Sequence, residues 1–528
     1  MLFASYEFIF FLICVFLIYY ILPKKWQWIF LLIASYVFYF IANPLYLIFI
    51  TTTSFTIYFA ACRIEKLRVA FKEKGFPEGI DKEEKKALKA KEKALEKKWM
   101  LGALLLNIGI LAVLKYTNFV ISNINGVALL AGSEFSIERL NIILPMGISF
   151  YTFQAVSYLI DIYHGKYDAQ KSFPRFALFV SFFPQLVQGP ISRYSDLARS
   201  LYEPHSFDYK TFSFGIQRIM WGFFKKLVVA DRILVAVNAI IKNPDTYDGV
   251  FVFFGMLFYA LELYADFTGG IDITIGIAQA LGITVAENFE RPFFSKNIKE
   301  YWKRWHITMG TWFTDYIFYP LSVSKFMRNL NKFARKHFGD YVGKRLPVYF
   351  SSFVVWLTTG IWHGASWNFI VWGLGNYLVI MVSEELSPLY DAFHRKFNVK
   401  DTKGFKLFQV VRTVLIMSCL RMFDCYRDVP LTFKMFGTMF TRFRLSALNA
   451  EMFSGLGLKS TDYVILILAT VCLIMVSLKQ RSGSVREKIL GFNIFGRYLV
   501  WFGLFLIIIL FGAYGIGYDE SQFIYNQF

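Results

Sequence analysis

The chain has 528 residues, of which 56% are hydrophobic and 20% aromatic, and its formal net charge is +19 at pH 7. Its mean hydropathy of +0.44 is higher than that of a soluble domain, which must cover its core with polar residues. The composition therefore excludes an ordinary soluble protein and indicates an integral membrane protein.

Apolar runs suited to crossing about 30 Å of hydrocarbon recur along the whole chain. They cover residues 3–22, 26–42, 44–62, 99–121, 247–265, 348–362, 462–478 and 498–516. The first run has no basic residues before it and no small-residue cleavage site, so we expect a retained first span and not a signal peptide. These runs predict an all-α polytopic membrane protein with about 11–13 helical segments.

The largest hydrophilic insertion, residues 63–98, has thirteen Lys or Arg residues against eight Asp or Glu residues. Together with Lys24 and Lys25 after the first run, its charge predicts a cytoplasmic insertion and an N-terminus outside the cell. Its second half, from Asp81 to Lys98, has charges at i,i+4 spacing and is expected to be a solvated helix, with a partner-docking helix as the alternative.

The net positive charge of the chain is explained by basic loops on the cytoplasmic side of the membrane, so it does not indicate a nucleic-acid partner. We treat residues 1–528 as one membrane domain that contains this insertion.

From about Leu144 to Pro320 the apolar segments are short and interrupted by Pro and Gly. Broken helices at membrane depth are tolerated where they face protein or water, so this region predicts a polar cavity or tunnel. Ionisable residues in or beside apolar segments point the same way. They are Asp161, Glu262, Asp266, Asp272, His306, Asp315 and His363. The simpler interpretation is that a neighbouring backbone group or Arg satisfies each carboxylate.

Two of the six histidines, His306 and His363, lie among tryptophans in very apolar surroundings. His363 directly precedes Gly364, which indicates the end of a helix. His306 lies in "EYWKRWHITMGTWFTDY", a pattern that favours an amphipathic or partly buried helix over a plain span. A buried imidazole, whose ordinary pKa is about 6.5, stays neutral and can act as a general base. The alternative is a structural histidine or one in an interfacial aromatic belt.

Other chemistry has little support in the sequence. There is no GxSxG elbow, no GxxxxGK[ST] loop and no HExxH motif. The five cysteines form no CxxC pair, so neither a disulfide framework nor a metal site is indicated.

Several long motifs, in one order, resemble the membrane-bound O-acyltransferase family. Within it they are most similar to bacterial membrane subunits of the alginate O-acetyltransferase type, with D-alanyl transfer proteins of teichoic acid modification as more distant relatives. The motifs are "LPMGISFYTFQAVSYLIDIYHGK" (144–166), "FFPQLVQGPISRY" (182–194), "MWGFFKKLVVADR" (220–232), "YADFTGGIDITIGIAQALGI" (264–283), "NFERPFFSKNIKEYWKRWHITMGTWFTDYIFYPL" (288–321), "WHGASWNFIVWG" (362–373) and the closing "FIYNQF". Three stretches depart from the family pattern: Gly270 replaces an aromatic residue, "FYPLSVSK" lacks paired glycines, and "RMFDCYRD" (421–428) replaces a stretch closer to "FFRA".

The resemblance implies a ring of helices around a central tunnel in a bacterial cytoplasmic membrane. It places His363 at the family's catalytic position and His306 at a second active-site position. It implies an acyl thioester donor, acetyl-CoA in the first place, with no permanently bound cofactor and no metal. It also implies an outer-face partner of the SGNH-hydrolase kind and a polysaccharide as the final acceptor.

We therefore predict a membrane O-acyltransferase that moves an acyl group, most simply acetyl, from a cytoplasmic thioester toward an extracytoplasmic polysaccharide, with His363 as the general base. One alternative is a D-alanyl transferase that uses a carrier-protein thioester. The other is a transporter or export channel, but the sequence shows no paired inverted repeats of broken helices.

Overall fold

A computed structural model of the chain describes residues 5–77 and 79–514. Within these residues it contains 23 α-helices, six short 3-10 or π-helical segments and no strand, only a single bridge between Phe289 and Trp305. The prediction of an all-α class is therefore confirmed. The C-terminal "FIYNQF" motif lies outside the described residues.

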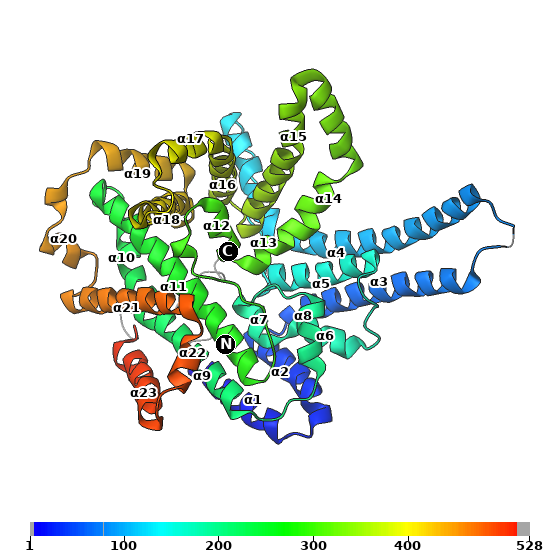
Figure 1. The fold of residues 1–528 in the computed structure, drawn as a ribbon, viewed down its shortest axis with the longest axis horizontal. Coiled ribbons are helices and arrows are strands. Elements are labelled where there is room, and N and C mark those ends of the chain that lie inside the picture. Colours follow the sequence, from blue (N-terminus) through cyan, green and yellow to red (C-terminus); the bar gives the residue numbers. More distant parts are fainter. Residues whose placement is uncertain (1–4, 78, 515–528) are drawn as a thin grey trace. The chain divides into compact units, whose positions relative to one another are not determined.

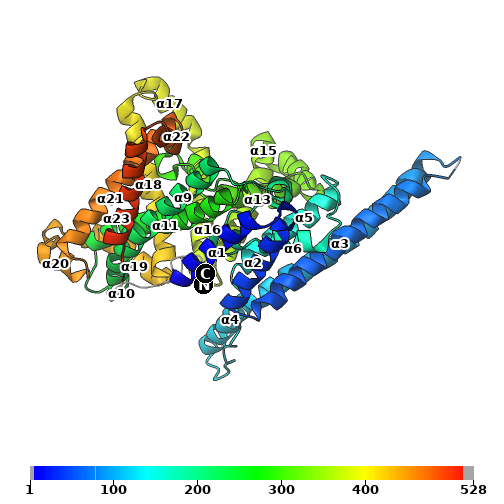
Figure 2. The ribbon, with the colours of Figure 1, turned by 90° about the horizontal axis from the view of Figure 1, so that it is seen from below.

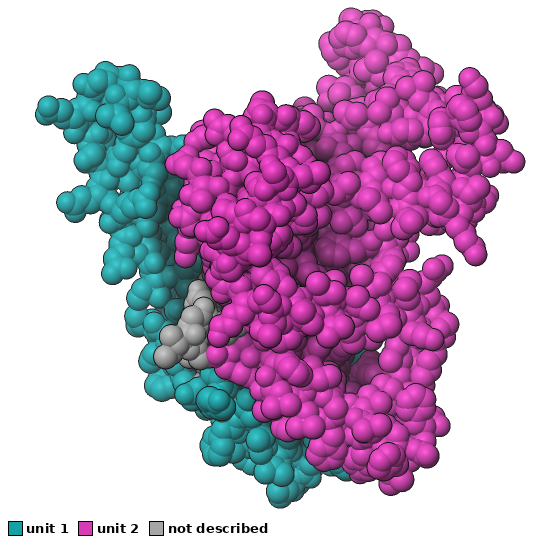
Figure 3. All heavy atoms as spheres, turned by 90° about the vertical axis from the view of Figure 1, so that its left-hand side faces the viewer, with its two compact units in different colours: residues 1–213, 277–286 teal, residues 214–276, 287–528 magenta. Residues whose placement is uncertain are grey.

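The chain divides into two compact units, which Figure 3 colours separately. The first unit comprises residues 1–213 and 277–286, and the second comprises residues 214–276 and 287–528. The expectation of a single membrane domain over residues 1–528 stays a prediction.

The first unit is formed by the N-terminal helices. They are α1 (Tyr6–Ile21), α2 (Gln27–Ala42), α3 (Tyr46–Lys74), α4 (Lys82–Leu130), α5 (Ile148–His164), α6 (Phe173–Ser181), α7 (Phe183–Gln188) and α8 (Tyr194–Tyr202). In Figure 1 and Figure 2, α3 and α4 run side by side as a long hairpin that extends beyond α5 and α6.

The insertion at residues 63–98 is the outer part of this hairpin. α3 ends where Gly75 takes a positive φ of 60°, and Asp81 caps α4 by accepting a hydrogen bond from the Glu84 backbone N–H. The helix expected from Asp81 onward is present and continues unbroken to Leu130. A salt bridge of 3.1 Å between Arg68 and the buried Glu96 joins the two helices.

The second unit contains the remaining helices. They are α9 (Tyr209–Phe223, whose first turn belongs to the first unit), η2 (Phe224–Ala230), α10 (Asp231–Lys242), α11 (Val250–Ala280, whose last turn belongs to the first unit), η3 (Pro292–Phe294), α12 (Ile298–Arg304), α13 (Ile307–Phe313), η4 (Thr314–Phe318), α14 (Tyr319–Ser322), α15 (Lys325–His363), α16 (Trp367–Glu385), α17 (Ser387–Phe397), α18 (Lys403–Tyr426), α19 (Val429–Thr441), η5 (Leu445–Ala447), α20 (Ala450–Gly455), α21 (Ser460–Lys479), η6 (Gln480–Ser482), α22 (Val485–Leu490) and α23 (Ile494–Phe511). Figure 1 shows that α15 doubles back on itself. The bend lies at Gly339, whose φ of 82° favours a residue without a side chain.

Six helices in the described part of the chain are long and apolar enough to cross a membrane, or seven if the bent pair α16 and α17 counts as one span. The six are Lys24–Ala42, Tyr46–Lys74, Lys82–Leu130, Val250–Ala280, Ser460–Ser482 and Ile494–Phe511. The multi-pass prediction is confirmed, and six of the eight predicted apolar runs lie in these candidate spans, apart from their ends. The run 3–22 corresponds to the shorter apolar helix Tyr6–Ile21, and the run 348–362 lies in α15, which is not one of the candidate spans.

Glycines bring two pairs of helices of the second unit into close contact. A Cβ atom on Gly222 of α9 would lie 2.6 Å from the carbonyl oxygen of Gly269 on α11. A Cβ atom on Gly373 of α16 would lie 2.5 Å from the carbonyl oxygen of Trp356 on α15. Small residues allow such close approach of membrane helices. The second contact, at Trp356, lies about two turns before the end of α15, where His363 lies.

Candidate active site

His306 lies at a break between two short helices, α12 and α13, and is 1% exposed. The sequence favoured an amphipathic or partly buried helix here, but the backbone of His306 has a φ of 51°, which interrupts the helix. The break is held by Asn288, whose backbone oxygen accepts a hydrogen bond from Ile307 N, while Trp305 forms the isolated bridge with Phe289. Long-range backbone pairing has therefore overridden the local helical pattern.

The side chain of Asn288 also sets the orientation of the His306 ring. Its Oδ1 atom accepts hydrogen bonds from the backbone N and from Oγ1 of Thr308, each at 3.0 Å. His306 Nδ1 lies 3.2 Å from the same oxygen. Because this oxygen accepts, Nδ1 donates, and Nε2 of the neutral imidazole is the nitrogen that can take a proton.

The pKa of His306 is lowered to about 3, first by burial and then by the positive charge of Arg421. His306 lies outside the candidate spans. An imidazole with so low a pKa is neutral throughout the physiological range, as the sequence predicted for a buried histidine.

His363 is the last residue of α15, as predicted from the following Gly364, and it is 6% exposed. Its ring centroid lies 4.5 Å from that of Trp372 on α16 and 5.2 Å from that of Trp362. The Trp362 ring also lies 6.2 Å from the ring of His306. The structure thus places the two predicted site residues, His306 and His363, next to the same ring, that of Trp362.

The sequence did not predict that Arg421 belongs to this cluster. Its guanidinium carbon lies 4.9, 5.1 and 5.7 Å from the rings of Trp372, Trp305 and Trp302, within the range of cation–π contacts. Nη1 donates a hydrogen bond of 2.8 Å to Asp424 Oδ2, and both side chains are buried. One feature of the sequence could have indicated this role. Arg421 and Asp424 have opposite charges and lie three residues apart in an apolar helix, within the stretch 421–428 that departs from the family pattern. We call His306, His363, Arg421, Asp424 and the three tryptophans around Arg421 the aromatic cluster.

Two buried asparagines hold the helices of the cluster together. Asn376 Oδ1 accepts a hydrogen bond of 3.2 Å from Trp302 Nε1, while its Nδ2 donates to the Trp372 carbonyl. Asn368 Nδ2 donates a hydrogen bond of 3.1 Å to the carbonyl of Phe423 on α18. Buried hydrogen bonds of this kind restrict the positions of the side chains that form them. The cluster can therefore present a neutral imidazole in a defined orientation beside a buried positive charge.

The other predicted ionisable residues do not join the aromatic cluster. Asp161 pairs with Lys166 at 2.7 Å, Asp272 pairs with Arg218 and Lys225, Asp266 pairs with Lys226, and Asp315 is exposed in η4. For the three paired aspartates, satisfaction by a neighbouring cation is confirmed. Among the residues that the structure describes, Glu262 forms no such ion pair, and it lines a separate cavity.

Residues 168–426 match the family model described as MBOAT, membrane-bound O-acyltransferase family. The chain is also similar to probable alginate O-acetylases of Pseudomonas syringae pv. tomato and Pseudomonas putida, each 32% identical over 364 residues. These matches cover 68% of this chain, 64% of the first relative and 68% of the second, so the chain spans about two thirds of their length. A peptidoglycan O-acetyltransferase of Helicobacter pylori is 31% identical over 327 residues, 57% of this chain and 58% of the relative.

Proposed function

The chain belongs to the membrane-bound O-acyltransferase family, and on this premise we propose that it transfers an acyl group, acetyl in the first place, from a cytoplasmic thioester toward hydroxyl groups of an extracytoplasmic polysaccharide. The observation that carries the proposal is the pair of buried histidines on either side of Trp362. The names of the similar proteins, which describe O-acetylation of alginate or of peptidoglycan, support this class of acceptor.

In the proposed reaction His363 is the general base. It takes the proton of the attacking hydroxyl as the oxygen bonds to the thioester carbonyl carbon, the C–S bond breaks, and the proton passes to the departing thiolate. His306, held by Asn288, orients the donor or the acceptor. Positioned proton transfer of this kind contributes about 10²- to 10⁴-fold to a rate.

The proposed donor is acetyl-CoA, and the proposed partner is an outer-face acetyltransferase of the SGNH-hydrolase kind that completes transfer to the polymer. A tunnel through the thinned centre of a helix ring would let donor and acceptor approach from opposite faces, which supplies proximity. The proposed location is a bacterial cytoplasmic membrane with the N-terminus outside.

The proposal is tested by the O-acetyl content of surface and secreted polysaccharides in cells with and without this protein. We expect ester-linked acetate to disappear from one polymer when the protein is absent and to return when it is supplied again. Unchanged acetate together with a loss of ester-linked D-alanine would replace acetyl by D-alanyl as the group transferred. No change in either ester would contradict an acyltransferase function.

The topology has its own test. A single cysteine at position 85, on the outer part of the α3–α4 hairpin, should resist an impermeant maleimide in intact cells and react after the membrane is permeabilised, because the positive-inside rule places this hairpin in the cytoplasm. The matched control is a cysteine at position 133, in the loop after α4, which should react in intact cells. Labelling of position 85 and not of position 133 in intact cells would invert the proposed orientation.

A further inference from the structure

A pocket of about 260 Å³ lies in the second unit, between α16, α17, α18 and the segment that leads into α12. Its wall carries three basic side chains, Lys296, Lys299 and Arg412, besides His394, but only one acidic side chain, Glu384. We call it the basic pocket. Small-molecule sites occupy roughly 300–1,000 Å³, so a pocket just below this range suits one end of a ligand.

Two of the three basic groups have no carboxylate partner. Lys299 forms a salt bridge with Glu384, so these two charges compensate each other. Arg412 Nη2 instead donates a hydrogen bond of 3.0 Å to the backbone oxygen of Lys296, which holds the guanidinium beside this segment. Within the described residues neither Arg412 nor the Lys296 ammonium forms a salt bridge. The pocket therefore has an excess of positive charge that favours an anion.

The donors of the basic pocket suit phosphate in particular. A guanidinium presents its N–H groups in a planar fork that matches two phosphate oxygens, and an ammonium adds a compact positive charge. Ser383, Ser387 and Gln409 line the same pocket, and their hydroxyl and amide groups can donate further hydrogen bonds. A tetrahedral anion with several acceptor oxygens can use all of these donors.

Aromatic rings lie beside these donors. Tyr390 and Phe393 of α17 line the pocket and are 39% and 44% exposed. Phe405 of α18 stacks on Phe393, with ring centroids 6.1 Å apart and an angle of 29° between the planes. A purine base stacks on such rings, and aromatic side chains also lie at the headgroup level of membranes. The pocket therefore favours a phosphate ester with an apolar or aromatic part over inorganic phosphate.

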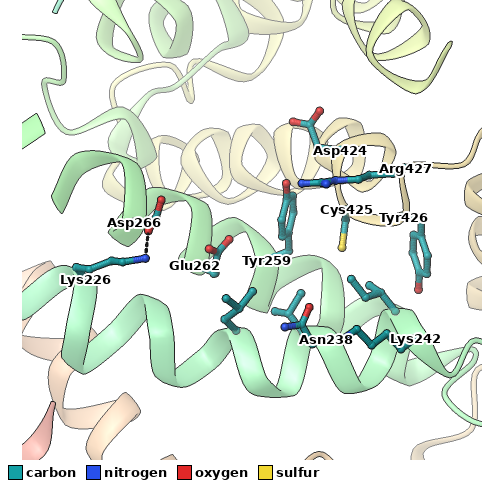
Figure 4. A pocket seen from close by; sticks show the side chains of 13 residues that line it. Lys226, Asn238, Lys242, Tyr259, Glu262, Asp266, Asp424, Cys425, Tyr426 and Arg427 are labelled. Carbon is teal, nitrogen blue, oxygen red and sulfur yellow. Dashed lines mark hydrogen bonds and ion pairs between the residues drawn. The ribbon is translucent and has the colours of Figure 1, made fainter. Parts of the chain in front are cut away.

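Another cavity of the second unit, shown in Figure 4, differs from the basic pocket in its acidic wall. There Lys226 lies between Asp266 and Asp231, at 2.7 and 2.8 Å, so its charge is already paired. Glu262 and Asp424 add further acidic groups to the wall. An anion in this cavity would approach carboxyl groups in surroundings of low dielectric constant, which is unfavourable. Of the two cavities, the basic pocket is the one that suits phosphate.

The basic pocket lies along the same helices as the aromatic cluster, but at a distance from it. On α18, Arg412 precedes Arg421 by nine residues, and on α16, Ile380 of the pocket follows Trp372 by eight. At about 1.5 Å per residue these separations are about 12–14 Å. The flexible arm of a coenzyme A thioester has about as many backbone bonds as four extended residues, and so reaches about 13–14 Å.

The charge pattern predicts which side of the membrane the basic pocket faces. Residues 394–406, which include the pocket residues His394 and Phe405, contain five Lys or Arg residues and one acidic residue, Asp401. By the positive-inside rule this segment is cytoplasmic. Soluble nucleotides and the anionic headgroups of the inner leaflet are both found on that side.

We propose that the basic pocket binds a phosphate ester, with Lys296 and Arg412 on the phosphate oxygens and Tyr390 and Phe393 against the rest of the ligand. Two sources share this chemistry: a nucleotide, free or as the end of a coenzyme A thioester, and the headgroup of an anionic phospholipid. The inference goes beyond the proposed function and holds whether or not the chain transfers an acyl group.

The nucleotide source is tested by equilibrium binding of radiolabelled ADP and coenzyme A to the full chain in phosphatidylcholine nanodiscs. We expect saturable binding of both, with adenosine, which lacks phosphate, at least about tenfold weaker as a competitor. Lys296→Gln and Arg412→Gln should each weaken ADP binding about tenfold, because each removes one positive charge from the pocket. The matched control is Lys403→Gln, at an exposed lysine that starts α18 outside the pocket, and it should bind as the parent does.

The phospholipid source is tested by native mass spectrometry of the same proteins released from nanodiscs that also contain phosphatidylglycerol. If a headgroup occupies the pocket, Lys296→Gln and Arg412→Gln should each retain about one fewer phosphatidylglycerol molecule per chain than the parent and Lys403→Gln.

Either result supports the phosphate site and names its source. Neither saturable ADP binding nor retained phosphatidylglycerol in the parent would overturn it. So would binding that Lys296→Gln and Arg412→Gln both leave unchanged, or adenosine that competes as well as ADP. An equal loss of binding in Lys403→Gln would show that only the general positive charge of the surface attracts the ligand, and would overturn the site as well. The proposed function is not involved in any of these outcomes, because no acyl group is transferred in either measurement.

Discussion

Replacing His363 by glutamine should lower the initial rate of polymer O-acetylation by about 10²- to 10⁴-fold, because the proposed general base is lost while most of the side-chain volume remains. His363 is buried against Trp372 and Trp362, so a side chain of similar size keeps the end of α15 packed. The measurement is the formation of acetyl ester from labelled acetyl-CoA in membrane vesicles that contain equal amounts of parent or variant protein. His363→Ala should show at least as large a loss.

The matched control is His164→Gln, at an exposed histidine that ends α5 in the first unit. This variant should transfer acetyl groups at the parent rate. His306→Gln should also lower the rate, but the same assay should show a larger change in the donor or acceptor concentration at half-maximal rate if His306 orients a substrate. A normal rate with His363→Gln would remove His363 from the proposed mechanism, whatever His306 does.

The spans and the position of His363 could be predicted because both depend on local sequence. Hydropathy over about 20 residues decides whether a helix can cross a bilayer, and the runs identified in this way coincide with helices such as α3 and α21. Gly364 stops α15 because the chain becomes extended there, with a φ of −170°. No long-range information was needed for either prediction.

The environment of His306 and the place of Arg421 could not be predicted because both depend on contacts between distant segments. Asn288 lies 18 residues from His306, and its hydrogen bonds interrupt a pattern that is helical in isolation. Arg421 lies on α18, and the tryptophans that surround it come from α12, the residue after α12, and α16. A family resemblance supplied the assignment of His363 as the proposed base, but the stretch that contains Arg421 is one of the departures from the family pattern.

Replacing Asp424 by alanine should destabilise the protein by about 3–5 kcal/mol, the cost of leaving one partner of a buried ion pair without its counter-charge. The side chains of Arg421 and Asp424 are 5% and 3% exposed, so both charges are largely withdrawn from bulk water. The measurement is thermal unfolding of the purified protein in detergent, where the midpoint should fall well below that of the parent. Changing both residues, Arg421→Met with Asp424→Leu, should recover most of the loss, since an apolar pair of similar volume avoids the desolvation of two charges.

The exposed pair of Lys406 and Asp401 provides the control, because surface salt bridges contribute about 0–1 kcal/mol. Asp401→Ala should therefore leave the unfolding midpoint almost unchanged. An Asp424→Ala midpoint equal to that of the parent would show that other groups stabilise the Arg421 charge, for example the faces of Trp372 and Trp305.

The double variant also tests whether the positive charge of Arg421 takes part in the reaction. Since burial is the larger cause of the low pKa of His306, the imidazole should stay neutral without Arg421. A stable double variant that transfers acetyl groups slowly would then mean that the positive charge serves the reaction, and not the protonation state of His306.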